Sequence, residues 1–530
     1  MVRLTAVLAA CLLTASAAFA QHETHGAGSP DLIGSASVKF QTSCVPPLEA
    51  DFNKAVALLH SFWFPEAIKA FEGILAADGN CAMAHWGIAM SQWGNPFGGI
   101  KPARTVELTK AAIEKAQSTG KPTPRERAYI DAVAQLVTAS DPGSHPARIA
   151  AYEAAMEKVA RDNPNDTEAT IFYALAVNQT APPTDKTYAK NLKAAGILEP
   201  LFEKMPTHPG LAHYIIHAYD APPLAEKALV AARKYASLAP AVPHALHMPS
   251  HTFTRVGSWQ ESIETNKRSA DAARRSNGAG EELHALDYQT YAYLQIAQDK
   301  AAKSVVDHAR EVTGGPGAPV NAFAVAAIPA RYALERGQWQ EAAALTPSPA
   351  PTPFTEAITY FARALGAARS GKPDAATADI ERLAALRDKE RELKDPYWTE
   401  QIDIQRQVAL AWQTFASGKK DEGLAQMSAA ANAEDATDKS AISPGPLAPA
   451  RELYGEMLLE AGKTKEALAA FELTMKKEPN RYRGIAGAAR AAEKLGDKAK
   501  AAAYYKKLLD VAKDADTERP ELAQAKKLTQ

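Results

Sequence analysis

The sequence predicts an all-α fold, a solenoid of antiparallel helix pairs. Alanine is abundant, alternation of β-branched residues is scarce, and apolar residues recur at helical spacing along most of the 530 residues. The C-terminal part also repeats: Gly462 matches Gly496 and Phe471 matches Tyr505, and each pair is 34 residues apart. Helix pairs that recur at such a period bury their apolar faces on their neighbours.

In this C-terminal part, a turn glycine is followed by an alanine and, four residues later, by an aromatic residue. Pro479 closes one such unit. This pattern resembles the tetratricopeptide repeat (TPR). Gly337 and Gly371, also 34 residues apart, extend the pattern upstream. The resemblance implies an α-solenoid of TPR-like antiparallel helix pairs, with a concave groove lined by the first helix of each pair.

The chain divides into five predicted segments. Residues 1–20, with Arg3, an apolar run and an A-x-A site at 18–20, read as a signal peptide. The motif "LAAC" at 8–11 allows a lipoprotein site as the alternative. We expect the other segments to be an extended N-terminal segment at 21–45, a TPR-like array with a histidine-rich groove at 46–275, middle TPR-like repeats with loop insertions at 276–445, and C-terminal TPR repeats at 446–530.

Composition and missing motifs exclude several function classes. Without residues 1–20, which hold one charged residue, 59 basic residues face 61 acidic ones, so the charge does not favour nucleic acid as a partner. No later stretch is long and apolar enough to predict a transmembrane segment in the mature chain. The sequence has no C-x-x-C-H motif and no Walker loop, so we expect neither covalent haem nor a nucleotide cofactor. The predicted location is periplasmic or secreted.

Cys44 and Cys81 flank two helical patterns, at about 47–62 and 65–78. A helical hairpin returns its two ends to the same side, so the two cysteines should lie close together. In an oxidising compartment this predicts a disulfide. Two independent buried thiols are the alternative.

The histidines follow the same 34-residue register. His213 matches His247 and His217 matches His251. Residues three and four apart share a helix face, and neighbouring helices lie about 8–10 Å apart, so these imidazoles could meet on one ion. The predicted metal ligands are His213, His217, His244, His247, His251 and His284.

An all-imidazole site suits a transition metal such as Zn, Cu, Fe or Ni. Asp220 and Asp287 are candidate carboxylate ligands or acceptors behind an imidazole. Arg255 could hold a carboxylate or phosphate of a ligand, or it could be a solvated surface residue. For His60 and His85, which lie among aromatic residues, packing in the core is favoured.

Two alternatives to a metal site stay open for the histidine cluster: a polar groove that binds an organic or peptide ligand, and purely structural hydrogen bonding. Pro249 bears on all three interpretations, because a helix that begins at Pro249 would move His244 off the shared face.

Four segments, "LLHSFWFPEAIKAFEGIL", "CAMAHWGIAMSQWGNPFGG", "HYIIHAYD" and "HALHMPSHTFTR", together resemble exported bacterial TPR-containing proteins over residues 45–290. This resemblance implies the fold and no particular activity. Two functions follow: a metal-binding protein, with or without metal-dependent catalysis, or a non-catalytic scaffold that binds a protein, peptide or small molecule in its groove.

Overall fold

The computed structural model describes residues 32–314, 320–347 and 350–529. These ranges form α-helices and short 3-10 helices and contain no β-strand. The all-α prediction is therefore confirmed for the described residues. The predicted signal peptide at 1–20 lies outside them.

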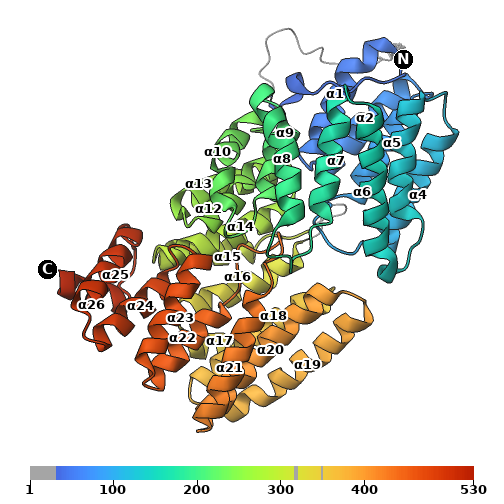
Figure 1. Ribbon diagram of the computed structural model, residues 1–530. Helices are drawn as coiled ribbons and strands as arrows, with labels where there is room; N and C mark the ends of the chain where they lie inside the picture. Colours follow the sequence, from blue (N-terminus) through green and yellow to red (C-terminus); the bar gives the residue numbers. More distant parts are fainter. Residues whose placement is uncertain (1–31, 315–319, 348–349, 530) are drawn as a thin grey trace, which may run out of the picture. The chain divides into compact units, whose positions relative to one another are not determined.

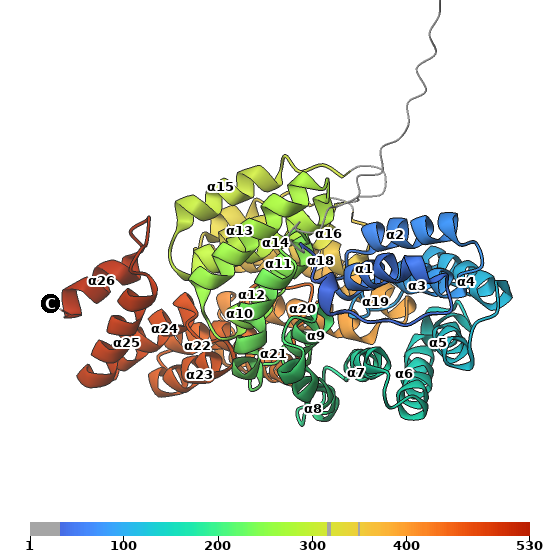
Figure 2. The same ribbon diagram turned by 90° about the horizontal axis from the view of Figure 1, so that it is seen from above.

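Helices that are neighbours in the sequence pack against one another, as the gradual change of colour shows in Figures 1 and 2. The first half of the chain contains α1 Glu49–His60, α2 Phe64–Ala77, α3 Ala82–Trp93, α4 Ala103–Ser118, α5 Pro124–Ala134, α6 His145–Asp162, α7 Thr167–Gln179, α8 Ala189–Lys204, α9 Pro209–Ala218, α10 Leu229–Leu238, α11 Pro243–His247 and α12 Pro249–Arg255. The second half contains α13 Trp259–Arg275, α14 Ala279–Gln295, α15 Asp299–Ala309, α16 Ala322–Glu335, α17 Trp339–Ala343, α18 Pro353–Arg369, α19 Thr377–Glu392, α20 Pro396–Ala416, α21 Lys420–Asp435, α22 Ala450–Glu460, α23 Thr464–Lys477, α24 Tyr482–Lys494, α25 Lys498–Val511 and α26 Pro520–Thr529.

Buried aromatic side chains wedge between helices where glycine leaves room. The ring of Phe471 on α23 lies so close to Gly487 on α24 that a Cβ there would be 2.3 Å from a ring atom. Phe71 on α2 has the same relation to Gly87 on α3, again at 2.3 Å and again 16 residues downstream. Any larger residue at either glycine would overlap the ring, so this packing depends on glycine.

The hydrophobic core is continuous from Val38 to Phe253. A second cluster of buried apolar residues covers Trp259–Tyr332, and a third covers Phe323–Ala491. The helices on either side of the boundary between the first and second clusters, α9, α11, α12 and α14, carry the predicted histidine ligands.

The described part of the N-terminal segment packs onto the first helices. Phe40 is buried and contacts Phe52, Trp86 and Tyr129. Cys44 and Cys81 form a disulfide that spans 37 residues and closes the α1–α2 hairpin. The disulfide prediction is therefore confirmed.

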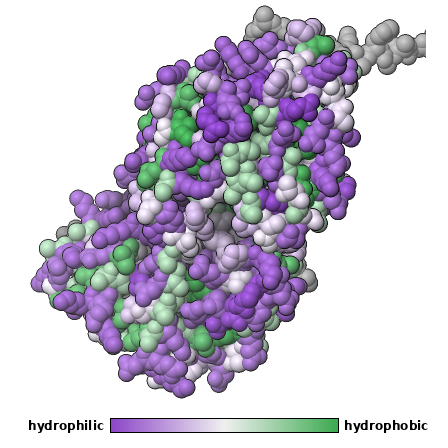
Figure 3. All heavy atoms as spheres, turned by 45° about the vertical axis from the view of Figure 1, so that its right-hand side comes forward, coloured by the Kyte–Doolittle hydropathy of each residue, from purple (hydrophilic) through white to green (hydrophobic). Residues whose placement is uncertain are grey.

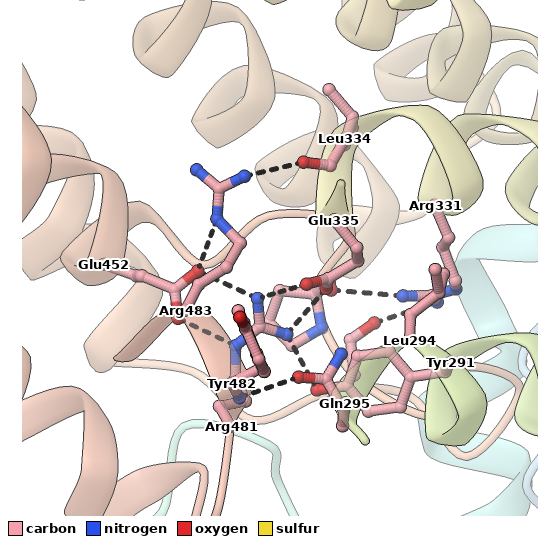
Figure 4. A network of polar contacts seen from close by, with 12 residues as sticks. Tyr291, Leu294, Gln295, Arg331, Leu334, Glu335, Glu452, Arg481, Tyr482 and Arg483 are labelled. Carbon is pink, nitrogen blue, oxygen red and sulfur yellow. Dashed lines mark hydrogen bonds and ion pairs between the residues drawn. The ribbon is translucent and has the colours of Figure 1, made fainter. Parts of the chain in front are cut away.

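One fully buried arginine joins the C-terminal helices to the middle of the chain (Figure 4). Arg481, just before α24, donates to Glu335 at the end of α16 at 2.8 Å and to Glu452 on α22 at 2.8 Å. It also donates to the hydroxyl of Tyr291 on α14 at 3.0 Å. Arg481 and both carboxylates are almost completely shielded from solvent. Because a buried charge is tolerated only when it is paired, these contacts fix how the four helices meet.

The face of the molecule drawn in Figure 3 is largely hydrophilic, and its hydrophobic residues form small separate patches. Among the described residues, no helix combines the length and the apolar character that crossing a membrane requires.

Replacing both bridged cysteines, as Cys44→Ser with Cys81→Ser, should lower the free energy of unfolding by about 3–4 kcal/mol, since the closed loop restricts the unfolded chain. Urea unfolding of the oxidised wild type and the variant measures the difference. Adding a reductant should bring the wild type to the level of the variant. Equal stability with and without reductant would contradict the prediction.

Arg481→Met should lower the free energy of unfolding by about 3–5 kcal/mol, because Glu335 and Glu452 then lose their shared counter-charge in a buried place. The matched control is Arg310→Met, which removes an arginine that is 66% exposed and pairs with Asp307, itself 48% exposed, and should cost less than about 1 kcal/mol. Two variants of equal stability would show that the buried network does not hold these helices together.

Candidate metal centre

Six histidines from four helices lie close together. His213 and His217 lie on α9, His244 and His247 on α11, His251 on α12, and His284 on α14. Ring centroids of neighbouring members are 4.3–6.2 Å apart. The structure thus brings together all six histidines that the sequence predicts as metal ligands.

Pro249 interrupts the helix without separating its histidines. α11 ends at His247 and α12 begins at Pro249, yet Met248 between them keeps the helical conformation with φ −52° and ψ −37°. A helix does begin at Pro249, but it continues nearly in the register of α11, so His244 stays with the other histidines. Proline lacks an N–H, so the turn before it loses hydrogen bonds.

Side chains of α13 hold α11 by hydrogen bonds to its backbone. Thr265 donates to the carbonyl of Leu246 at 2.7 Å, and Ser269 donates to the carbonyl of Pro243 at 2.8 Å. Buried carbonyl groups need such partners. α13 therefore holds α11 in the position that keeps His244 in the cluster.

The first group of potential ligands consists of His213, His217 and His244, whose ligand atoms all lie within 4.8 Å of one another. The Nδ1–H of His213 donates to the carbonyl of His60 at 2.6 Å. A carbonyl only accepts, so Nε2 of His213 carries the lone pair, and it lies 3.2 Å from Nε2 of His217. The Nε2 of His244 is buried and has no hydrogen-bond partner among the described residues.

The second group consists of His247, His251 and His284, whose ligand atoms also lie within 4.8 Å of one another. Nδ1 of His247 lies 2.7 Å from Oδ1 of Asn266, whose Nδ2 donates to the carbonyl of Ser262. That second bond fixes the amide orientation, so Oδ1 accepts and Nδ1 of His247 carries the proton. Nδ1 of His251 donates to Asp220 at 2.9 Å.

These two hydrogen bonds leave the Nε2 atoms of His247 and His251 as bare lone pairs, 3.0 Å apart. Two acceptors cannot hydrogen-bond to each other, so a cation between them is needed to turn this repulsion into attraction. In a tetrahedral zinc site with bonds of about 2.0–2.1 Å, two ligand nitrogens lie about 3.3 Å apart, close to the distance seen here.

Burial keeps these imidazoles neutral. Desolvation lowers the pKa of His251 to about 4, although the hydrogen bond to Asp220 opposes the shift. Desolvation also lowers the pKa of His284 to about 3 and holds those of His213, His217 and His247 well below the usual histidine value. A neutral imidazole is the form that ligates a metal.

Asp220 is the carboxylate behind the second group. Burial opposes its ionisation, but the charges of Lys439 and Arg255 outweigh burial and hold the pKa of Asp220 well below its usual range. Arg255 donates to Asp220 at 2.8 Å and is itself 2% exposed. The Arg255 side chain is therefore buried and ion-paired, not a solvated surface residue. An ionised Asp220 is a strong acceptor for the Nδ1–H of His251, which makes Nε2 a better ligand.

Asp287 lies farther from the imidazoles. It pairs with Arg331 at 2.8 Å, and no metal-ligand group among the described residues includes it. Arg331 also donates to the carbonyl of Gly445 and to Ser443, in the loop 436–449. Tyr288 on α14 connects the same loop to the cluster: its hydroxyl lies 3.2 Å from the carbonyl of Ser443 and 3.5 Å from Nε2 of His251.

A third group that could hold an ion consists of His60, Glu168 and His208. Here a carboxylate lies between the two imidazoles, and only Nδ1 of His208 has no hydrogen-bond partner among the described residues. The two oxygens of Glu168 lie 2.8 Å from Nε2 of His60 and 3.0 Å from Nε2 of His208, and Nδ1 of His60 lies 2.9 Å from the hydroxyl of Tyr214. His60 also stacks on Phe172, in line with its expected place in the core. His85 is partly exposed and belongs to none of the three groups.

Of the residues that orient the ligands, the sequence predicts Asp220 but not Asn266. Asn266 and Lys439 follow no register with the histidines, and Glu168 is far from its partners in the chain. Glu281 could have been found, because it lies 34 residues after His247. Its Oε2 is buried, has no hydrogen-bond partner among the described residues and lies 3.7 Å from Nδ1 of His244.

Comparisons of the sequence with models of known protein families and with curated proteins find no match.

Acidification should destabilise the metal-free chain between pH 6.5 and about 5. A histidine whose pKa is lower in the folded than in the unfolded state takes up a proton on unfolding in this window, so the free energy of unfolding falls by about 1.4 kcal/mol per pH unit for each such residue. Glu390 and Glu434, whose pKa values burial raises to about 7, act in the opposite sense, whereas His145, whose pKa burial lowers to about 4, adds to the effect.

Urea unfolding at pH 6.5 and pH 5, in the presence of a chelator, measures this effect. His251→Gln should show a shallower pH dependence than the wild type, because one of the shifted imidazoles is gone. Equal stability of the wild type at the two pH values would contradict the prediction.

Proposed function

We propose that this chain is an exported solenoid of TPR-like helix pairs whose histidine cluster binds a transition metal. The observation that carries the proposal is the pair of bare Nε2 atoms of His247 and His251, 3.0 Å apart and held by Asn266 and Asp220. An apolar or fully hydrogen-bonded core has no reason to place two lone pairs against each other, since the contact is repulsive in the absence of a cation.

The ligand set favours a first-row transition metal. The groups His213–His217–His244 and His247–His251–His284 contain imidazoles only, which suit Zn, Cu, Fe or Ni better than Ca or Mg. Three imidazoles leave a fourth position of a tetrahedral ion for water or a substrate, as in catalytic zinc sites. The site therefore suits metal-dependent catalysis as well as metal binding.

Export and the TPR-like architecture are supported by separate features. The disulfide between Cys44 and Cys81 fits an oxidising compartment. The turn glycines Gly462 and Gly496, 34 residues apart, have the same φ of 76°, and Phe471 fills the slot at Gly487 in the way that small residues admit an aromatic wedge between repeats.

The chain, purified without a histidine tag and loaded by metal exchange after chelation, should retain metal in stoichiometric amount. His247→Ala together with His251→Ala should lower the amount of metal retained, since the closest pair of ligand nitrogens is lost. Asn266→Ala should weaken binding about 10–100-fold, because His247 loses the acceptor that orients it. Metal analysis and competition with a chromogenic chelator measure both effects.

The matched control is His308→Gln, which removes a histidine that pairs with Glu282 outside all three groups and should bind metal like the wild type. A metal-free wild type that neither takes up metal nor gains thermal stability from it would refute the proposal.

A further inference from the structure

The histidine cluster is built from the same arrangement twice. In each of its two groups, two histidines lie one helical turn apart and the third comes from the next helix of the cluster: His213 and His217 with His244, then His247 and His251 with His284. Corresponding members are 34, 34 and 40 residues apart. The groups share no residue.

The shortest distances between histidine rings lie inside each group. Ring centroids are 4.9 and 5.1 Å apart in the first group and 5.0 and 4.3 Å apart in the second. Across the boundary, His217 is 5.8 Å from His251 and His244 is 6.2 Å from His247. The short Nε2–Nε2 contacts, 3.2 and 3.0 Å, also occur once in each group. One ion bound to either group would leave the three imidazoles of the other group without a metal.

We propose that the cluster holds two transition-metal ions side by side, one on His213, His217 and His244 and the other on His247, His251 and His284. This inference rests on the proposed metal-binding function. Each ion has three imidazole ligands and one open position, the set of a three-histidine zinc site.

Charge near the cluster fits a second ion. Asp220 already faces two cations, Arg255 and Lys439, so little of its charge is left for the metals. Glu281 supplies a further carboxylate. It lies on α14 with His284 of the second group, and its buried Oε2 lies 3.7 Å from His244 of the first group. Two cations repel each other, and an anionic group that faces both groups lowers that repulsion.

The test is a zinc titration of the full mature chain, made metal-free by chelation, with native mass spectrometry as the readout. The wild type should bind two Zn²⁺ per chain. His213→Ala should bind one, through the second group, and His284→Ala should bind one, through the first group. The variant that combines His213→Ala with His284→Ala should bind no Zn²⁺ with an affinity comparable to that of the wild type. His308→Gln, the control outside the cluster, should bind two.

Circular dichroism and the melting temperature in chelator verify that each variant is folded before it is titrated. If a single variant does not fold, His213→Gln and His284→Gln, which keep more of the side-chain volume, replace it. One Zn²⁺ per wild-type chain at saturation would overturn the two-ion inference and leave the proposed function standing. A wild type that binds no zinc, copper, iron or nickel would overturn both.

Discussion

The two hydrogen bonds that hold His247 and His251 by their Nδ1 atoms govern the whole centre. Asn266 and Asp220 each accept one N–H, so the Nε2 lone pairs are turned toward each other, 3.0 Å apart. Such a contact is unfavourable in a site too buried for the imidazoles to be protonated. The surrounding helices must therefore be rigid enough to maintain it until a cation binds.

That rigidity comes from polar groups that are buried and fully partnered. Asn266 is itself held by a bond to its own helix, and Thr265 and Ser269 tie α13 to the carbonyls of α11 around Pro249. Arg481 performs a similar task farther along the chain, where it joins α14, α16 and α22. Networks of this kind specify one arrangement of helices, because each member left without its partner would carry a large desolvation penalty.

The contrast with His60, Glu168 and His208 shows what distinguishes a metal centre from a structural network. Both groups are buried and both are rich in histidine. In the His60–Glu168–His208 group, a carboxylate lies between the imidazoles and accepts from each, so both of these contacts are attractive without an ion. In the metal centre, imidazoles face imidazoles. The difference lies in one acceptor and in the tautomers that it imposes, not in the number of histidines.

The sequence by itself determined the helical class, the bridging of Cys44 with Cys81, and the set of six histidines, because these depend on local periodicity and on a repeat that maps equivalent residues onto neighbouring helices. Only the tertiary structure decided which imidazoles pair and which nitrogen of each is free. The free nitrogen of each ring depends on acceptors such as Asn266 and Asp220, and Asp220 is in turn paired with Lys439. These residues have no fixed spacing from the histidines in the chain. The effect of Pro249 was likewise decided by the tertiary structure, because α11 is held in place by the hydroxyl groups of Thr265 and Ser269 on another helix, α13.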